Sequence, residues 1–377
     1  MEQISFSQNW QELLAFLPAG WQSQAKQLGA LRRCRKFASP EELLRTLLIH
    51  LAEGCSLRTT AVKARLGAIA AVSDVTIMNR LKASSEWLRW LAVNLKQEWI
   101  NQRSTIVEEK KLSLKIVDAT TICEPGATGT TWRIHYAISL PSLRCEEVQL
   151  TSPKTGESFL RFSVSPGDIF LADRGYCQGP GIAYVVKNGG HVLLRIKYSL
   201  ALYEAPEKRW DVFTHLRQLK VGEVGDWPVQ LETAAGLIPG RVCAMKKSEA
   251  AAAKARKEIA KEAKRKGKTV QPKTWEAAGY IMVFTTINNL AAADVLEIYR
   301  LRWQIELVFK RLKSLMGLGH LRKTDVEGAR AWLHGKLLVA FMLEAMLRAG
   351  ETFSPWGYPL RTESEHLAGD GVYVAVA

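Results

Sequence analysis

The sequence lacks any pair of closely spaced cysteines. Its six cysteines are Cys34, Cys55, Cys123, Cys145, Cys177 and Cys243, and no two lie closer than 21 residues. This spacing excludes a CxxC zinc knuckle. We therefore expect free thiols in a reducing compartment.

Long hydrophobic runs are also missing. Residues Met1–Ser5 show no basic segment leading into an apolar one, so no signal peptide is expected. The longest apolar stretch, Leu337 to Leu347, is about half a membrane span and contains Glu344. We expect a cytoplasmic, nucleoid-associated protein with no membrane partner.

Acidic residues are too few to balance the basic ones. Asp and Glu total 37 against 52 Lys and Arg, a net charge of +15 with a pI near 9.6. Such a charge indicates a polyanionic partner, and the absence of a membrane span favours nucleic acid. The alternative is a merely soluble basic protein. With 377 residues, 47% of them hydrophobic, the chain is expected to form two or three domains with sizeable cores.

Residues 1–110 predict an all-α N-terminal domain. Ser39-Pro40-Glu41-Glu42 is a helix start. Further starts follow at Ser56 and at Ser73-Asp74, separated by a break at Gly67. Two short helices with a break between them suit a helix-turn-helix reader of DNA. A plain helical bundle is the alternative.

Strand patterns replace helical ones from residue 111. Strands are expected at 112–118, 132–140, 147–150, 169–172 and 191–196, with a helix over 180–188, which indicates a mixed α/β core. Residues 199–290 predict a β-rich insertion with strands near 229–231, 237–238, 241–245 and 280–284. The segment from Lys246 to Lys273 contains eleven Lys or Arg residues and only three Glu residues. This basic arm is expected to contact phosphates, with a solvated charged helix as the alternative.

Residues 292–315 and 326–348 predict two further helices. On an ideal helix Tyr299, Arg302, Glu306, Lys310 and Lys313 share a sector of about 80° beside the apolar face, which includes Leu301 and Leu315. One acid among three cations suits an anionic substrate, whereas a solvated ion-pair helix is the alternative.

Two aspartates each end an apolar strand. Asp118 follows Lys115-Ile116-Val117, and Asp173 follows Phe170-Leu171-Ala172. Alone, each is typical of a turn or helix cap. Together with Glu306 they form a set of oxygen ligands suited to Mg²⁺, and two such ions can stabilise both oxygens of a phosphodiester displacement.

These residues resemble a known family. Tyr299, Arg302, Glu306 and Lys313 match the Tyr-Arg-Glu-Lys signature of the insertion-sequence-four family of DDE transposases. Val117-Asp118-Ala119-Thr120 and Asp173-Arg174-Gly175-Tyr176 are similar to its two aspartate motifs. The resemblance implies an RNase H-like catalytic core (111–198 and 291–350) interrupted by the β-rich insertion domain (199–290).

The resemblance also implies roles. Asp118, Asp173 and Glu306 would be the catalytic, metal-binding triad, holding two Mg²⁺ or Mn²⁺ ions. Tyr299, Arg302 and Lys313 would contact the terminal phosphates, with Lys310 and Arg174 as further DNA contacts. The DNA partners would be terminal inverted repeats and target DNA, bound by a homodimer in a synaptic complex, with cutting through a hairpin.

Two features depart from the family pattern. The tryptophan expected to hold a flipped base is replaced by Tyr280, with Trp275 five residues earlier. The C-terminal tail (351–377) is short, whereas relatives carry a longer helical tail that pairs subunits. Two alternatives stay open: a related metal-dependent DNA nuclease, and a non-catalytic DNA-end-binding protein such as a decayed transposase.

Overall fold

The computed structural model describes the chain in two compact units. The described residues are 6–104, 113–124, 126, 131–140, 144–234, 236–319, 321, 323 and 325–352. The first unit comprises Met1–Glu109, Thr121–Trp132 and Val308–Ala377, and the second comprises Lys110–Thr120 and Arg133–Leu307. Met1–Ser5 and nearly all of the tail 351–377 lie outside the described residues, so the expectations about them are not addressed by the structure.

The first unit is built mainly from helices. They are α1 (Phe6–Leu14), α2 (Trp21–Gln27), α3 (Pro40–Ala52), α4 (Leu57–Leu66), α5 (Asp74–Ala83), α6 (Ser85–Ser104) and α13 (Val326–Thr352). The three expected helix starts are confirmed, because Ser39, Ser56 and Ser73 each accept a hydrogen bond from a backbone N–H of the following first turn.

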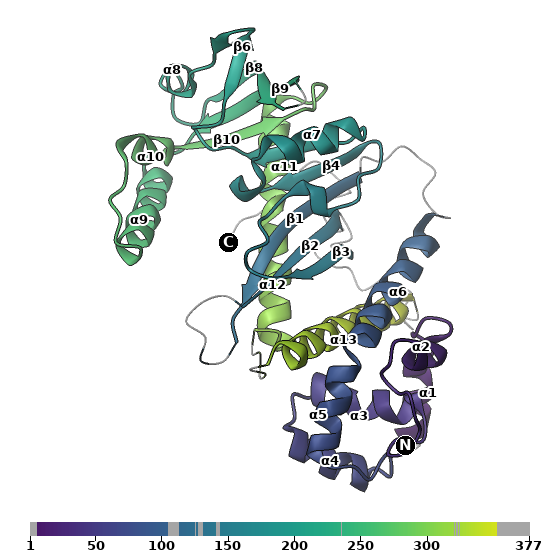
Figure 1. The fold of residues 1–377 in the computed structure, drawn as a ribbon. Coiled ribbons are helices and arrows are strands. Elements are labelled where there is room, and N and C mark those ends of the chain that lie inside the picture. The colour runs from purple at the N-terminus through teal and green to yellow at the C-terminus, as the bar shows by residue number, and fades with distance from the viewer. Residues whose placement is uncertain are drawn as a thin grey trace. The chain divides into compact units, whose positions relative to one another are not determined.

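Helix α13 ties this unit together. It contacts α3, α5 and α6, and α3, α4 and α5 contact one another (Figure 1). Leu43, Leu47 and Leu51 of α3 are fully buried. Nδ1 of the buried His334 on α13 lies 3.0 Å from the carbonyl oxygen of Ser85. Apolar packing and one buried polar contact therefore join the C-terminal helix to the N-terminal ones.

The second unit contains most of a ten-stranded sheet with the order β3-β2-β1-β4-β5-β10-β9-β8-β6-β7. Strands β1, β4 and β5 are parallel, and the pairs β2–β3, β5–β10, β10–β9 and β9–β8 are antiparallel. The strands are β1 (Ser113–Ile122), β2 (Trp132–Leu140), β3 (Arg144–Thr151), β4 (Asp168–Ala172), β5 (His191–Arg195), β6 (Leu202–Ala205), β7 (Lys208–Arg209), β8 (Val224–Thr233), β9 (Gly236–Lys246) and β10 (Tyr280–Thr285). The mixed α/β character is as expected.

The remaining elements connect these strands. They are η1 (Phe159–Arg161), η2 (Arg174–Tyr176), α7 (Gly179–Lys187), α8 (Val212–Leu216), α9 (Glu249–Arg265), α10 (Pro272–Ala277), α11 (Ala292–Arg300), η3 (Leu301–Trp303), α12 (Gln304–Lys310) and η4 (Arg311–Leu315). The predicted helix over 180–188 is confirmed as α7, and most of the basic segment forms the helix α9.

One strand prediction was too fragmented. The runs 237–238 and 241–245 belong to one strand, β9, despite Pro239. Strand β10 pairs with β9 only from Arg241 to Lys246, so Pro239 lies beyond that ladder. A proline, which has no N–H to donate, is tolerated where one side of the strand is unpaired.

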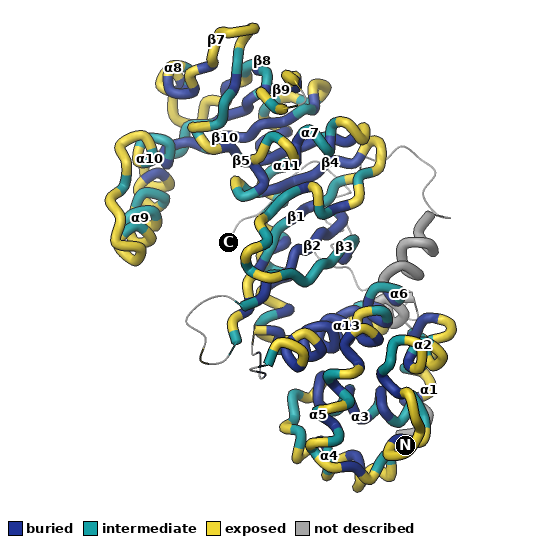
Figure 2. The backbone as a smooth tube through the Cα atoms, in the orientation of Figure 1, coloured by how far each residue is buried: buried dark blue, intermediate teal, exposed yellow. Residues whose placement is uncertain are grey.

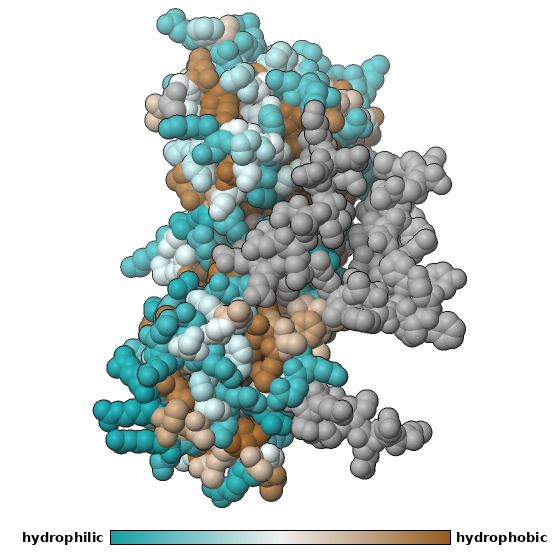
Figure 3. Space-filling model, turned by 90° about the vertical axis from the view of Figure 1, so that its right-hand side faces the viewer, coloured by the Kyte–Doolittle hydropathy of each residue, from teal (hydrophilic) through white to brown (hydrophobic). Residues whose placement is uncertain are grey.

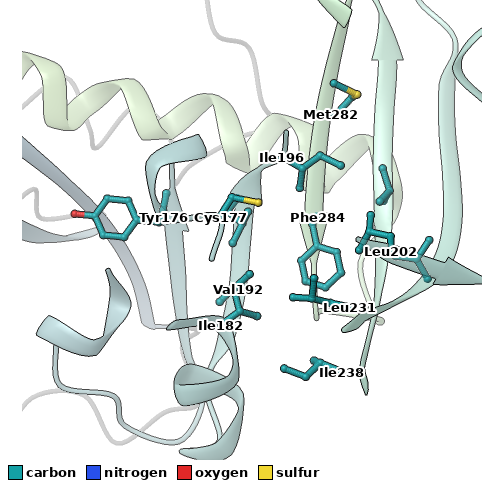
Figure 4. Packing of buried hydrophobic residues seen from close by; sticks show 14 of the residues in the cluster. Tyr176, Cys177, Ile182, Val192, Ile196, Leu202, Leu231, Ile238, Met282 and Phe284 are labelled. Atoms are coloured by element: carbon teal, nitrogen blue, oxygen red, sulfur yellow. The ribbon is translucent and has the colours of Figure 1, made fainter. Parts of the chain in front are cut away.

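A large apolar cluster fills one face of the sheet. It includes Phe170, Leu194 and Phe284 from three strands, together with Ile182 of α7. Figure 2 shows these central strands buried, whereas α9 has half-buried and exposed residues along its length. In Figure 4 the hydroxyl of Tyr176 points away from the labelled aliphatic residues, so its ring packs while its polar end leaves the cluster.

The surface carries no continuous apolar band on the face drawn in Figure 3, where brown patches are interrupted by hydrophilic residues. Among the helices of the described ranges, none combines the length and apolar character needed to cross a membrane.

Candidate active site

Strand register brings the two predicted aspartates together. In the parallel pair β1–β4, Val117 lies opposite Ala172. Asp118 is the next residue of β1, and Asp173 directly follows β4, so the two aspartates occupy neighbouring positions. Strand β1 continues to Ile122 and does not end at Asp118 as predicted, but its pairing with β4 ends at Val117. Carboxyl ends of adjacent parallel strands are where α/β sheets commonly bind ligands.

Asp173 also shapes the turn that follows β4. Its Oδ1 accepts a hydrogen bond of 2.9 Å from the backbone N–H of Gly175, capping η2. The Oδ1 of Asp118 similarly accepts a 2.7 Å bond from the N–H of Ala119. Each aspartate therefore has one oxygen committed to the backbone, which fixes where its other oxygen lies.

The segment carrying Glu306 is not the single α-helix that the periodicity predicted. A 3₁₀ turn at Leu301–Trp303 interrupts it after α11, and a π-helical turn at Arg311–Leu315 follows α12. These turns change the rotation per residue. The buried side of Ile305, Val308 and Phe309 is confirmed, but Leu315, expected on the buried face, is 82% exposed.

Arg302 joins two of the three predicted acids. Its Nη2 lies 2.5 Å from Oε1 of Glu306, and its Nη1 lies 3.7 Å from Oδ2 of Asp118. The Arg302 side chain is only 16% exposed, against 56% for Glu306. The partly buried guanidinium therefore bridges the sheet edge and the helical segment within the second unit.

Burial makes the charge on Asp118 costly. Loss of solvent raises the pKa of Asp118 from 3.8 to about 6, an effect that Glu157 and Asp173 reinforce. The Ala119 N–H and Arg302 act in the opposite direction, lowering the pKa. A carboxylate in this position is better tolerated when a further cation is present.

Several cations interact with these acids or with one another. Arg195 ends β5 and is half-buried; this burial lowers its pKa, and Arg174 lowers it further. Burial raises the pKa of Tyr299 to about 12, although Arg302 and Arg195 lower it. Burial lowers the pKa of Lys247 to about 8, and Arg195 and Arg174 add to this effect. These mutually repelling cations favour an anionic ligand.

The chemistry of the three acids fits a hard divalent cation, because all are carboxylates. Their side chains are not, however, arranged around a common point as metal ligands are. Within the described ranges no group of three or more His, Cys, Asp or Glu side chains is placed to hold a metal ion. Instead, the Arg302 guanidinium contacts Asp118 and Glu306, and its positive charge compensates these two carboxylates.

The other predicted contacts fall in different places. Lys310 and Lys313 belong to the first unit, where Lys310 is exposed and burial lowers the pKa of Lys313. Tyr280 is 6% exposed and belongs to the apolar cluster of the sheet. A ring packed there is not available to an extruded base without displacement. Trp275, 42% exposed, is the more accessible aromatic.

One acidic residue near the aspartates escaped the sequence reasoning. Glu157 is half-buried, and Asp118 and Asp173 each interact with it electrostatically. Its position in a loop before η1 carried no strand-end or helical signal. Only the sixteen-residue separation from Asp173 linked the two residues, and sequence spacing of that kind does not predict proximity.

The profile of the family described as "Transposase DDE domain" matches residues 151–342, about half of the chain. The InsL protein of insertion sequence element IS186A, from Escherichia coli (strain K12), is 31% identical over 359 residues, covering 92% of this chain and 96% of that protein. The chain belongs to the DDE transposase family. The matched span includes Asp173 and Glu306 but begins after Asp118.

Further relatives agree with this membership. The transposase for IS421 of Escherichia coli is 31% identical over 360 residues, with 92% of this chain and 96% of that protein covered. The transposase for IS231F of Bacillus thuringiensis subsp. israelensis is 27% identical over 203 residues, with 49% and 43% covered. A cryo-EM structure of the piggyBac transposase synaptic complex with hairpin DNA aligns with TM-score 0.45 and 8% identity, covering 94% of this chain and 75% of that one.

Proposed function

We propose that this chain is an insertion-sequence transposase that cuts DNA at the element's terminal inverted repeats and joins the ends to target DNA. The main observation in support of the proposal is that the fold brings Asp118, Asp173 and Glu306 into one region. Asp118 and Asp173 are neighbours by strand register, and Arg302 links Asp118 to Glu306. Membership of the DDE transposase family supports the same activity.

The fold class we propose is an RNase H-like core. The strand order β3-β2-β1-β4-β5, with an antiparallel β2–β3 pair and parallel β1–β4 and β4–β5 pairs, supports it. Strands β6 to β10 then extend the sheet and correspond to the proposed insertion, 199–290. In this interpretation residues 1–110 form a separate DNA-binding domain, and 111–198 with 291–350 form the core. Assignment to the insertion-sequence-four family, through Tyr299, Arg302, Glu306 and Lys313, is part of the same proposal.

We assign metal binding to Asp118, Asp173 and Glu306. Two Mg²⁺ or Mn²⁺ ions, when bound, would activate the attacking water or 3′-hydroxyl and stabilise the leaving oxygen. Arg302 would then release the carboxylates and turn to the DNA phosphate, because a guanidinium binds either anion with the same fork of N–H groups. The protein thus keeps its acids compensated before its substrates arrive.

The scissile region of the DNA would lie among the cations around Asp173. Arg302, Arg195, Arg174 and Lys247 supply positive charge, and the phenol of Tyr299 can donate to a phosphate oxygen. Lys313 and Lys310 are proposed as further phosphate contacts. For the flipped base of a hairpin route, exposed Trp275 is a better candidate than buried Tyr280.

Helix α9 is proposed as a second, sequence-independent DNA contact. Lys254, Lys257, Lys261, Lys264 and Arg265 are all exposed. On a helix they fall within a sector of about 100° and span about 16 Å. Neither Glu258 nor Glu262 falls inside that sector, and Glu262 is bound by Lys266 at 2.6 Å. Such a stripe matches a row of backbone phosphates.

Helices α4 and α5 are proposed to read DNA bases, since α4 presents exposed Arg58 and Arg65 on one side. A homodimer in a synaptic complex is proposed because two transposon ends must be joined in one event.

The test is cleavage of a labelled duplex that carries the element's own end, in Mg²⁺, Mn²⁺ or EDTA. Wild-type protein should nick at the end only with metal, and Asp173→Ala should bind the end without cutting it. Cleavage with no joined product would favour a nuclease. Binding without cutting in all metal conditions would favour the non-catalytic end-binding protein and contradict the proposal.

A further inference from the structure

Glu157 lies directly against the turn that follows Asp173. A Cβ atom on Gly175 would come within 1.8 Å of Oε2 of Glu157 and 3.0 Å of its carboxyl carbon. The carboxylate therefore occupies the space that any larger residue at 175 would need. Because Gly175 has no positive φ in this structure, a larger residue there would meet the Glu157 carboxylate and would not strain the backbone.

Two further links hold the loop of Glu157 to the same turn. Nε2 of Gln178 donates to the backbone oxygens of both Glu157 and Gly175, at 3.1 Å each. Ser158, the next residue, caps η1 through a 3.3 Å bond from the N–H of Leu160. The ring of Phe159 in η1 packs 5.2 Å from the ring of Tyr176 in η2. The loop of Glu157 and η1 are therefore held against the η2 turn by the hydrogen bonds of Gln178 and by the packing of Phe159 on Tyr176.

The carboxylate itself is poorly compensated. Within the described part of the chain, no hydrogen bond or ion pair reaches its oxygens. Arg133 and Lys197 are near enough to lower its pKa, but burial and Asp173 raise it. The hydroxyl of the fully buried Tyr176 also lacks a partner among the described residues. An unpaired carboxylate beside like charges is costly unless a cation comes to it.

We propose that Glu157 is a positioning residue for Asp173, because its carboxylate packs against Gly175 in the turn that follows Asp173 and adds negative charge beside the proposed metal-binding acids. The inference rests on the proposed function, because it takes Asp173 to be a metal ligand. Partners of this kind orient ligating carboxylates, and their loss typically weakens metal binding about 10- to 100-fold.

The test measures Mn²⁺ binding to the full-length protein by electron paramagnetic resonance, without DNA. Glu157→Gln keeps the shape and removes the charge, and it should raise the Kd for Mn²⁺ about 10-fold. Glu207→Gln, an exposed residue in the β6–β7 turn, is the matched control and should leave the Kd unchanged. Melting temperatures of the variants check that each one is folded.

A second variant separates position from charge. Gly175→Ala should displace the Glu157 carboxylate and weaken Mn²⁺ binding about as much as Glu157→Gln does. Glu157→Gln neutralises the carboxylate and Gly175→Ala displaces it, so both changes remove the same negative charge from the turn, and the double variant should be little worse than either single one. Fully additive effects would show that the contact between the two residues does not matter.

The outcomes distinguish the inference from the function beneath it. Mn²⁺ binding by Glu157→Gln equal to that of wild type would overturn the inference, whereas metal-dependent cleavage by wild type would still support the transposase. An altered melting temperature with an unchanged Kd would mean that Glu157 is only structural, which also contradicts the inference. If wild-type protein neither cuts DNA nor binds Mn²⁺ through Asp173, the proposed function itself fails.

Discussion

The acidic edge of the sheet and helix α9 use charge in opposite ways. Asp118, Asp173 and Arg302 are partly buried, and each is held by a specific partner. The lysines of the α9 stripe are exposed and lie on one face without specific partners of that kind. A buried charge has a large effect on its neighbours, whereas an exposed one acts through the summed field and is screened by salt. Single substitutions should therefore be decisive at the acidic edge and graded on α9.

The largest effect is expected for Glu306→Gln. The substitution keeps the size of the side chain but removes the charge that Arg302 and the metal would use. Cleavage should fall by at least about 10³-fold, equivalent to about 4 kcal/mol, while binding to the transposon end survives. Both can be measured on one labelled duplex. Loss of binding together with cleavage would mean that Glu306 is structural and would break the comparison.

The second expected effect is on stability. The folded pKa of Asp118 is about 6, above its ordinary value of 3.8. The contribution of Asp118 to stability is therefore fully present below pH 3.8 and is lost as pH rises through about 6. Asp118→Asn should stabilise the metal-free protein at pH 8 by up to about 3 kcal/mol.

Urea unfolding at pH 8 and pH 5 checks this prediction. The advantage of Asp118→Asn should shrink at pH 5, and Mg²⁺ should stabilise wild type more than the variant. A variant less stable than wild type at pH 8 would mean that the contact with Arg302 outweighs the cost of burial.

The α9 stripe should give a graded response. Replacing Lys257, Lys261 and Lys264 with Gln should reduce the slope of log K against log salt by up to about 3, because each phosphate contact contributes about 0.9. The change should be the same for element ends and for unrelated DNA. Replacing Lys187, Lys208 and Lys220 removes the same net charge elsewhere, so it should change the slope much less. Equal slopes of log K against log salt for the two triple variants would mean that α9 is a solvated helix that does not contact DNA.

The smallest effect is expected for Lys313→Ala. It should weaken end binding and flatten the salt slope by about one contact. Because Lys313 is half-buried, the melting temperature of the Lys313→Ala variant should be measured in parallel. An unchanged slope with a lower melting temperature would assign Lys313 to packing and not to DNA.

Local patterns predicted most of the elements of this fold. Ser39, Ser56 and Ser73 mark helix starts through a single side-chain bond to the next turn, a signal that is complete within four residues. Asp173 could be predicted as a strand-end residue for the same reason, whereas the prediction that a strand ends at Asp118 was wrong, because β1 continues to Ile122. Their adjacency depends on the pairing of Val117 with Ala172, 55 residues apart, which no local pattern encodes.

Features decided by tertiary contacts were missed. The 3₁₀ and π turns on either side of Glu306 change the rotation per residue from that of an ideal α-helix. The prediction that Leu315 lies on the buried face was therefore wrong. The runs 237–238 and 241–245 were predicted as separate strands, because the sequence does not show that β9 is unpaired with β10 at Pro239. Glu157 could not be found at all, since its relevance depends on the space left above Gly175.

The most direct test of the central claim is metal rescue at Asp118. Asp118→Cys replaces a carboxylate with a thiolate, a softer ligand that Mg²⁺ binds poorly and Mn²⁺ tolerates better. If Asp118 binds the metal, end cleavage by the variant should fall at least about 10³-fold in Mg²⁺ and recover at least about 10-fold in Mn²⁺. Equal residual cleavage in both metals, or wild-type cleavage in Mg²⁺, would contradict the assignment of Asp118 as a metal ligand.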